Sequence, residues 1–197
     1  MTRRIAAAAV LVLASGCATL PPAPATGDWP ARRAALQALP AWTLDGRIAV
    51  AAGEKGFSGG FDWAQDGERA DIELAGPMGG ARLRIHVDGA TIAVTDDRGN
   101  LYSGEEAERF VADRIGPGGK LPVAQMRYWL VGAPAPGAPH EEAIGADQRL
   151  AELSQSSWQV RYDSYKSVGN LDLPARVEMT TEGLRLRVVV SSWRLPP

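Results

Sequence analysis

The stretch that decides the fold is Ala81-Arg-Leu-Arg-Ile-His-Val87, which is followed at once by Asp88-Gly89. Leu, Ile and Val alternate in it with Arg, Arg and His. Because successive side chains of a β-strand point to opposite faces of the sheet, this order predicts a strand with one apolar and one solvated face. An Asp-Gly pair is typical of a tight hairpin turn, so the residues from Thr91 to Thr95 are predicted to return as the next strand.

The same alternation recurs along most of the chain and predicts about ten antiparallel strands. Besides residues 81–87 and 91–95, strands are expected near residues 41–50, 57–63, 71–74, 149–155, 158–166, 175–181 and 184–195. Their apolar faces must be covered, so the strands close into a barrel or half-barrel or stack as two sheets. A membrane-spanning barrel is disfavoured, because its apolar faces point outward and its strands need about 9–11 residues. The apolar faces should therefore point inward, either around a ligand cavity or into a fully packed core.

Three segments change to the spacing of helices. Asp28 is placed to cap the first, Ser103 and Glu106 have the spacing of a capping box for the second, and Pro122 opens the third, which Gly132 ends. The expected helices span residues 29–39, 103–116 and 122–132, and the Pro/Gly/Ala-rich residues 133–145 are expected to be a loop.

The N-terminus has the pattern of a bacterial lipoprotein signal. Arg3 and Arg4 precede a short apolar run, which closes with small residues directly before Cys17, the only cysteine. We therefore expect diacylglycerol and an N-acyl chain on Cys17; the alternative is an ordinary signal peptide with an incidental cysteine. Ala18 favours the outer membrane over retention at the inner membrane. The expected divisions are a signal peptide at residues 1–16, the lipidated cysteine and a flexible tether at 17–28, and one domain at 29–197.

Charge and catalytic motifs give little sign of nucleic-acid binding or of an enzyme. The net charge is −2, without the basic face that nucleic acid requires. The string Gly56-Phe-Ser58-Gly-Gly60 matches G-x-S-x-G, but it runs into a strand, whereas a nucleophile elbow needs a strand-to-helix turn. His86 and His140 have no neighbouring metal-ligand pattern. We expect no catalytic residue, no metal and no cofactor.

The segment Ala75-Gly-Pro-Met-Gly-Gly80 predicts a protruding turn between two strands, because Pro77 and the glycines disfavour strand pairing. Met78 at its tip is large and apolar, with no local group to bury it. It either folds back on the rim of the sheet or is an exposed finger that touches membrane.

Taken together and in order, several stretches make the chain resemble the LolB family, the outer-membrane lipoproteins that receive other lipoproteins from a periplasmic carrier. They are Trp42-Thr-Leu-Asp-Gly-Arg-Ile-Ala-Val50, Phe57-Ser-Gly-Gly-Phe-Asp-Trp63, Gly76-Pro-Met-Gly-Gly80, Met126-Arg-Tyr-Trp-Leu-Val-Gly132 with Pro134, Leu173-Pro-Ala-Arg176 and Ser192-Trp193.

The resemblance implies a fold, a mainly β half-open antiparallel barrel of about 10–11 strands with a lid of about three helices. It implies an anchored receptor in the periplasmic leaflet of the outer membrane, which takes acylated lipoprotein cargo from the carrier and inserts it into that membrane. The family's turn carries an exposed leucine needed for delivery, and Met78 stands at that position here, within an insertion loop of Pro77, Met78, Gly79 and Gly80. Such a receptor is expected to be monomeric.

The acyl-chain cavity is expected to be lined by the inward residues of the strands. The candidates are Trp42, Ile48, Phe57, Phe61, Trp63, Ile72, Leu74, Leu83, Ile85, Val87, Trp158, Tyr162, Val177, Met179, Leu186 and Val188. Three other interpretations stay open: a generic lipid-binding lipoprotein, a structural envelope lipoprotein with a packed β core and, third, an enzyme of lipid metabolism, for which activity of Ser58→Ala is the test.

Overall fold

The computed structural model describes residues 28–77, 80, 82–115 and 121–196. In chain order its elements are α1 (Trp29–Gln37), β1 (Ala41–Ala52), β2 (Lys55–Asp66), β3 (Arg69–Ala75), β4 (Arg82–Asp88), β5 (Thr91–Thr95), β6 (Leu101–Ser103), α2 (Glu105–Ile115), α3 (Val123–Val131), β7 (His140–Ile144), β8 (Leu150–Gln155), β9 (Trp158–Val168), β10 (Leu171–Thr181) and β11 (Leu184–Arg194).

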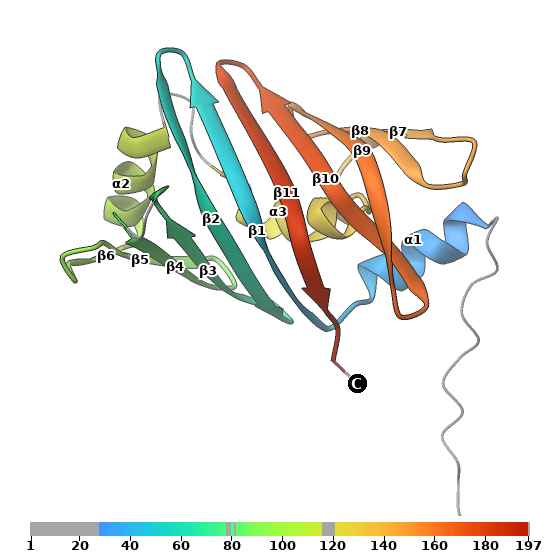
Figure 1. Cartoon of the computed structure of the whole chain (residues 1–197), viewed down its shortest axis with the longest axis horizontal. Coiled ribbons are helices and arrows are strands. Elements are labelled where there is room, and N and C mark those ends of the chain that lie inside the picture. The colour runs from blue at the N-terminus through green and yellow to red at the C-terminus, as the bar shows by residue number, and fades with distance from the viewer. Residues whose placement is uncertain (1–27, 78–79, 81, 116–120, 197) are drawn as a thin grey trace, which may run out of the picture.

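The eleven described strands form one antiparallel sheet in the order β6-β5-β4-β3-β2-β1-β11-β10-β9-β8-β7. Strands β1 to β6 make one meander and β7 to β11 a second, and the two join where the first strand pairs with the last. The sheet curves strongly but stays open, with β6 and β7 as its edges (Figure 1). The predicted mainly β, half-open fold with three helices is confirmed, as an open sheet and not a closed barrel.

The period-two pattern correctly predicted which way the strands face. In β4, Ile85 and Val87 are buried while Arg82, Arg84 and His86 are exposed, as the alternation requires.

The junction of the two meanders depends on one glycine. A bulge lies between Asp45 and Gly46 where β1 pairs with β11. A Cβ atom at Gly46 would lie 2.2 Å from the backbone oxygen of Val189, so no other residue fits without moving β11.

The helices cover one face of the sheet, here called the inner face. Figure 1 shows α3 behind the central strands β1 and β11, α2 near the β5–β6 end and α1 near the β8–β10 end. The buried apolar residues of sheet and helices form one cluster that runs from Trp29 to Trp193.

The structure differs from the sequence predictions in the short edge strands and the helix starts. Residues 133–145, expected to be a loop, contain β7, and the unpredicted β6 spans only three residues. Ser103 belongs to β6 and pairs with Ala93, so it does not cap α2, which begins two residues later at Glu105. Helix α1 ends at Gln37, two residues before its predicted end. Strands β1 and β2 have 12 residues each, longer than expected, although their outward side chains remain polar or small.

Candidate functional site

The inner face gathers all sixteen predicted lining residues into one apolar cluster. Thirteen of them are buried, and Phe57, Leu74 and Leu83 are partly buried against the same cluster. They come from β1 to β4 and from β9 to β11, so both meanders contribute. The sheet therefore has one continuous apolar inner surface; its use as an acyl-chain lining stays a prediction.

Aromatic rings occupy the inner face of the junction between the meanders. Trp42 lies between Trp63, with ring centroids 5.8 Å apart, and Trp193, with centroids 5.3 Å apart in an edge-to-face arrangement. Phe61 contacts Trp63 edge to face at 6.0 Å. Such pairs contribute about 0.5–1.5 kcal/mol beyond the area they bury. Trp193 is not among the predicted lining residues.

Helix α3 supplies side chains that the predicted lining lacked. Met126, Trp129 and Leu130 are buried beneath it, with exposed fractions of 3%, 0% and 0%. Their spacing of three and four residues is the signal that could have identified them, because it marks one face of a helix. Trp129 packs against Trp158 with ring centroids 6.0 Å apart. The centre of the inner face is thus filled by α3.

A large apolar pocket lies at the other end of the helical layer, between the β4–β5 hairpin, α2 and the start of α3. Its volume is about 510 Å³, within the range of small-molecule sites. The apolar part of the lining consists mainly of Ile85, Val87, Ile92, Val111, Leu121 and Val123, and Glu108 and Arg109 lie at its polar edge. A second pocket of about 490 Å³ shares Val87, Gly89, Ala90, Val123 and Ala124, so the two are neighbours along α3.

Of the predicted lining, Val87 borders both of these pockets and Ile85 borders the larger one. Trp63, Ile72 and Ile85 also border a hollow of about 390 Å³ whose other walls include the outward residues Asp71, Glu73 and His86. Trp42 borders a small pocket of about 140 Å³ beside α3. Val177, Met179, Leu186 and Val188 are packed in the core, with exposed fractions of 0–1%.

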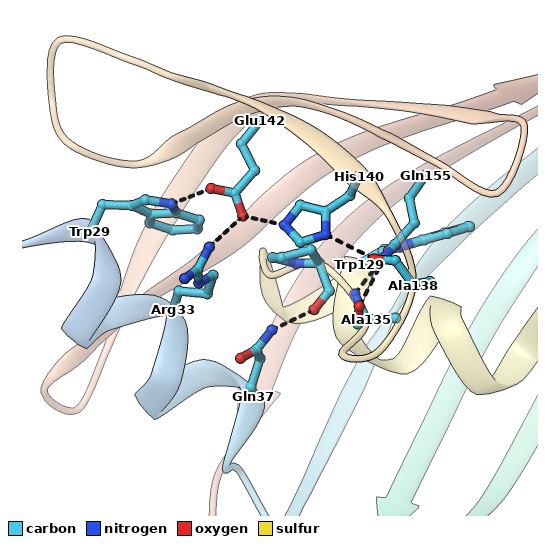
Figure 2. Close-up of polar contacts among 10 residues, drawn as sticks. Trp29, Arg33, Gln37, Trp129, Ala135, Ala138, His140, Glu142 and Gln155 are labelled. Carbon is cyan, nitrogen blue, oxygen red and sulfur yellow. Dashed lines mark hydrogen bonds and ion pairs between the residues drawn. The ribbon is translucent and has the colours of Figure 1, made fainter.

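Polar contacts fasten α1 and the segment before β7 to the β7–β8 end of the sheet (Figure 2). The carboxylate of Glu142 accepts hydrogen bonds from Trp29 Nε1 at 2.6 Å and Arg33 Nη1 at 3.1 Å, and His140 Nε2 lies 3.1 Å from it. Gln37 Nε2 donates to the carbonyl of Pro134 at 2.9 Å. Helix α1 is therefore held by hydrogen bonds to two separate segments, through the Glu142 side chain and the Pro134 carbonyl.

Gln155 is the buried centre of the same region. Its Oε1 accepts from Trp129 Nε1 and from the backbone N–H of Ala135, both at 2.8 Å, and its Nε2 donates to the carbonyl of Ala135 at 2.8 Å. Tyr162 adds a hydrogen bond of 2.9 Å from its hydroxyl to the carbonyl of Trp129. Burial raises the pKa of the Tyr162 hydroxyl well above its usual value, so this group stays a donor.

The predicted insertion loop is described only in part. Gly76 N–H donates to the Gly80 carbonyl at 2.9 Å and Gly80 N–H to the Pro77 carbonyl at 3.2 Å, which closes a turn between β3 and β4. Pro77 and Gly80 are exposed. Met78 and Gly79 lie outside the described residues, as does the predicted lipid attachment site Cys17.

The groups considered for catalysis lie apart. Ser58 lies within β2 opposite Ala49 on the outer face, in an extended strand with no turn to a helix. Ala64 of β2 pairs with Asp71 of β3, which in turn pairs with His86 of β4. Ser58 is six residues from Ala64 along β2, so Ser58 and His86 are about 20 Å apart. His86 pairs with Asp71 at 2.7 Å, and His140 is part of the Glu142 cluster.

In the described part of the chain, no group of three or more His, Cys, Asp or Glu residues could hold a metal ion. Among the same residues, no helix has the length and hydrophobicity to cross a bilayer.

These features define a class: open, curved antiparallel sheets with helices packed over an apolar inner face. Solved structures share this fold at low sequence identity. A LolA superfamily protein from Nitrosomonas europaea aligns with a TM-score of 0.52 and 10% identity, covering 84% of this chain and 94% of that one. A DUF1329 family protein from Desulfovibrio piger aligns with a TM-score of 0.57 and 8% identity, covering 88% and 93%.

Sequence comparison narrows the class to a family. The model of the family described as "Outer membrane lipoprotein LolB" matches residues 40–193. The chain is 33% identical to the outer-membrane lipoprotein LolB of Nitrosococcus oceani, over 94% of each chain. It is 31% identical to that of Pseudomonas aeruginosa, over 98% of this chain and 96% of the relative. The chain therefore belongs to the LolB family, and the predicted resemblance is confirmed.

Proposed function

We propose that this protein is a lipid-anchored receptor in the periplasmic leaflet of the outer membrane. It accepts acylated lipoproteins from a periplasmic carrier, holds their acyl chains against its inner face and inserts them into the membrane. Family membership supports the receptor role, since its relatives are named outer-membrane lipoproteins. In this proposal residues 1–16 are the signal peptide, Cys17 carries the lipid, 17–28 is the tether and 29–197 is the receptor domain.

The observation that carries the proposal is the apolar pocket of about 510 Å³ between the β4–β5 hairpin, α2 and α3. It opens beside the continuous apolar surface of the sheet, and Ile85 and Val87 belong to both. An acyl chain can begin to bind there while α3 still covers the centre. Transfer needs no reaction: the chain moves toward whichever site binds it with lower free energy.

Filling the pocket tests the proposal. Ala112→Trp places an indole in the pocket wall, whereas Ala64→Trp places the same group on the exposed outer face of β2. Purified carrier loaded with an acylated lipoprotein is mixed with each variant, and the cargo is followed by pull-down. Wild type and Ala64→Trp should take the cargo, and Ala112→Trp should take at least about tenfold less. Equal transfer by both variants would show that this pocket is not the acyl site.

A second function, that of a structural envelope lipoprotein, is favoured by one observation. The middle of the inner face is filled, with Val177, Met179 and Trp129 all inaccessible to solvent. In that case wild type stays folded and monomeric in the transfer assay while the cargo remains on the carrier. Binding of free fatty acid without any transfer from the carrier would instead indicate a generic lipid-binding lipoprotein.

Delivery to the membrane is assigned in this proposal to the turn between β3 and β4. Met78 would enter the lipid surface and lower the barrier for the acyl chains to leave. Met78→Glu should still accept cargo from the carrier but should insert it into vesicles about tenfold more slowly, while Met78→Leu should behave as wild type. Unchanged insertion by Met78→Glu would exclude this role.

A further inference from the structure

The outer face of the sheet, opposite the helices, carries five exposed arginines on neighbouring strands. They are Arg47 on β1, Arg185 and Arg187 on β11, Arg176 on β10 and Arg161 on β9. Figure 1 shows these strands side by side, with α3 on their far side. We call these five residues the arginine face.

The strand register places these arginines in rows across the sheet. Val189 pairs with Arg47 on one side and with Arg176 on the other. Val189 is 37% exposed, one of two large hydrophobic residues exposed among those described. Residues paired at this spacing have Cβ atoms about 4.5–5.5 Å apart, so an exposed apolar side chain lies between two guanidinium groups.

Only part of the positive charge is neutralised within the chain. Glu178 is bound by Arg187, with Nη2 2.6 Å and Nε 3.1 Å from Oε2, and Arg161 Nη2 lies 3.5 Å from Oε1. Arg161 also pairs with Asp163 at 3.0 Å. In the described part of the chain, Arg47, Arg176 and Arg185 form no ion pair within 4.0 Å, although the charge of Arg185 contributes to the lowered pKa of Glu178. Three guanidinium groups therefore face solvent with their donors available.

The surroundings allow a flat anionic surface to approach. In the rows of Arg47, Arg185 and Arg187, the other outward residues of β1 and β2 include Ala49, Ala51, Ser58 and Gly60, and the carboxylates Asp45 and Asp62 lie one row beyond Arg47. The four residues in the rows of the arginines are small, so the arginines project beyond them. Guanidinium groups bind phosphate oxygens in a bidentate manner, and an apolar residue among them can contact lipid.

We propose that the arginine face docks the domain onto anionic phospholipid, with Arg47, Arg176 and Arg185 on the lipid phosphates. Phospholipid is proposed as the ligand because the proposed function anchors the domain to a membrane through Cys17, and in this respect the inference rests on that function. The 11 residues from Cys17 to Gly27 reach at most about 40 Å, so an anchored domain stays within that distance of the bilayer. At such a distance the effective concentration of lipid headgroups around an exposed basic face is high.

Docking of this kind sets an orientation. With the outer face on the bilayer, the helices and the pocket between α2, α3 and the β4–β5 hairpin point away from it, toward an arriving carrier. Each basic residue near an anionic surface contributes about a fivefold factor in binding, which salt reduces.

The test uses the chain from residue 17 onward with Cys17→Ala, so that no acyl anchor contributes to binding. Co-sedimentation is measured with vesicles of phosphatidylcholine alone and with vesicles containing 40% phosphatidylglycerol, at low and high salt. Wild type should prefer the anionic vesicles. Arg47→Gln, Arg176→Gln and Arg185→Gln together should lower that binding by roughly 100-fold. The matched control removes equal charge from the ion-paired arginines of β3 and β4, with Arg69→Gln, Arg82→Gln and Arg84→Gln.

A fluorescence measurement locates the part of the domain that contacts the vesicle. A single cysteine at Ala49, beside the arginine face, carries an environment-sensitive dye, and the same dye at Ala64 is the comparison. Anionic vesicles should shift the emission of the first and leave the second unchanged.

Three outcomes would overturn the proposal. The first is equal binding to neutral vesicles, and the second is an equal loss in the matched control. The third is salt-sensitive self-association that the triple variant abolishes while vesicle binding stays unchanged, which would make a second copy the partner. None of these depends on cargo transfer, so failure here is distinct from failure of the receptor proposal.

Discussion

The two ends of the helical layer are built differently. At the β7–β9 end, α1 and α3 are fixed by hydrogen bonds that converge on Glu142 and Gln155 (Figure 2). At the β4–β6 end, α2 lies against β5 and β6 through apolar and aromatic contacts, such as the stacked rings of Tyr102 and Phe110, 4.2 Å apart. The pocket of about 510 Å³ lies at this second end, and the pocket of about 490 Å³ continues from it along α3 to Ala135. Because the 510 Å³ pocket lies between α2, the β4–β5 hairpin and the start of α3, we expect the layer to open on the α2 side.

The strongest test of this difference removes a large ring from each end. Trp129→Ala leaves a cavity under α3 and should lower the free energy of unfolding by about 3–5 kcal/mol. Phe110→Ala removes a half-buried ring from α2 and should cost less than half as much. Urea unfolding of both variants measures the two values. Similar losses would mean that the two ends are packed equally well.

The next test removes the buried amide while keeping its volume. Gln155→Met leaves Trp129 Nε1 and the backbone N–H of Ala135 without their acceptor, and should cost about 2–4 kcal/mol. Gln159→Met, on the exposed face of the neighbouring strand, is the control and should change stability by less than about 0.5 kcal/mol. If Gln155→Met and Gln159→Met have the same free energy of unfolding, the Gln155 amide does not fix α3.

A smaller, local effect is expected at α1. Glu142→Gln weakens the bonds from Trp29 and Arg33 and should raise amide hydrogen exchange in α1, equivalent to a loss of about 1–2 kcal/mol there. Exchange in α2 should not change. Glu141→Gln, on the exposed neighbour, serves as the control. Faster exchange in α2 as well would show that the two ends are coupled.

The smallest effect is on pH dependence. The hydrogen bond from Arg187 holds the pKa of Glu178 below its ordinary value in the folded protein. A carboxyl group with a lowered pKa adds stability above its unfolded pKa, and this is lost as pH falls through the folded value. Glu178→Gln should therefore lower the free energy of unfolding at pH 7 by about 1 kcal/mol or less. The free energy of unfolding of this variant should also fall less steeply than that of wild type as the pH is lowered. An unchanged acid slope in melts between pH 7 and pH 3 would contradict this.

The sequence predicted the faces of the strands better than their edges. Alternation in residues such as Leu83, Ile85 and Val87 is fixed by geometry, so the inner face could be assigned without a structure. Strand β7, with the sequence His-Glu-Glu-Ala-Ile, has mostly exposed side chains and carries no such alternation. It is recognisable only through its pairing with β8.

The pocket could not be derived in the same way. Its walls come from α2, α3 and the β4–β5 hairpin, and where gaps remain between them depends on side-chain packing and not on a periodic pattern. The same holds for Gln155, whose partners Trp129 and Ala135 are 26 and 20 residues away. The arginines of the outer face were visible as polar alternation, but their adjacency required the pairing of β1 with β11.

That pairing also sets the order in which the chain can fold. Arg47 and Val189 are neighbours in the sheet yet 142 residues apart along the chain. Each meander is made of local hairpins, which form quickly, whereas contacts over such separations form slowly. As the chain is synthesised or exported, β1 keeps one edge unpaired until β11 is available. A factor that shields this edge would therefore act on the unfinished chain, and a truncation of only the final strand should prevent folding of both halves.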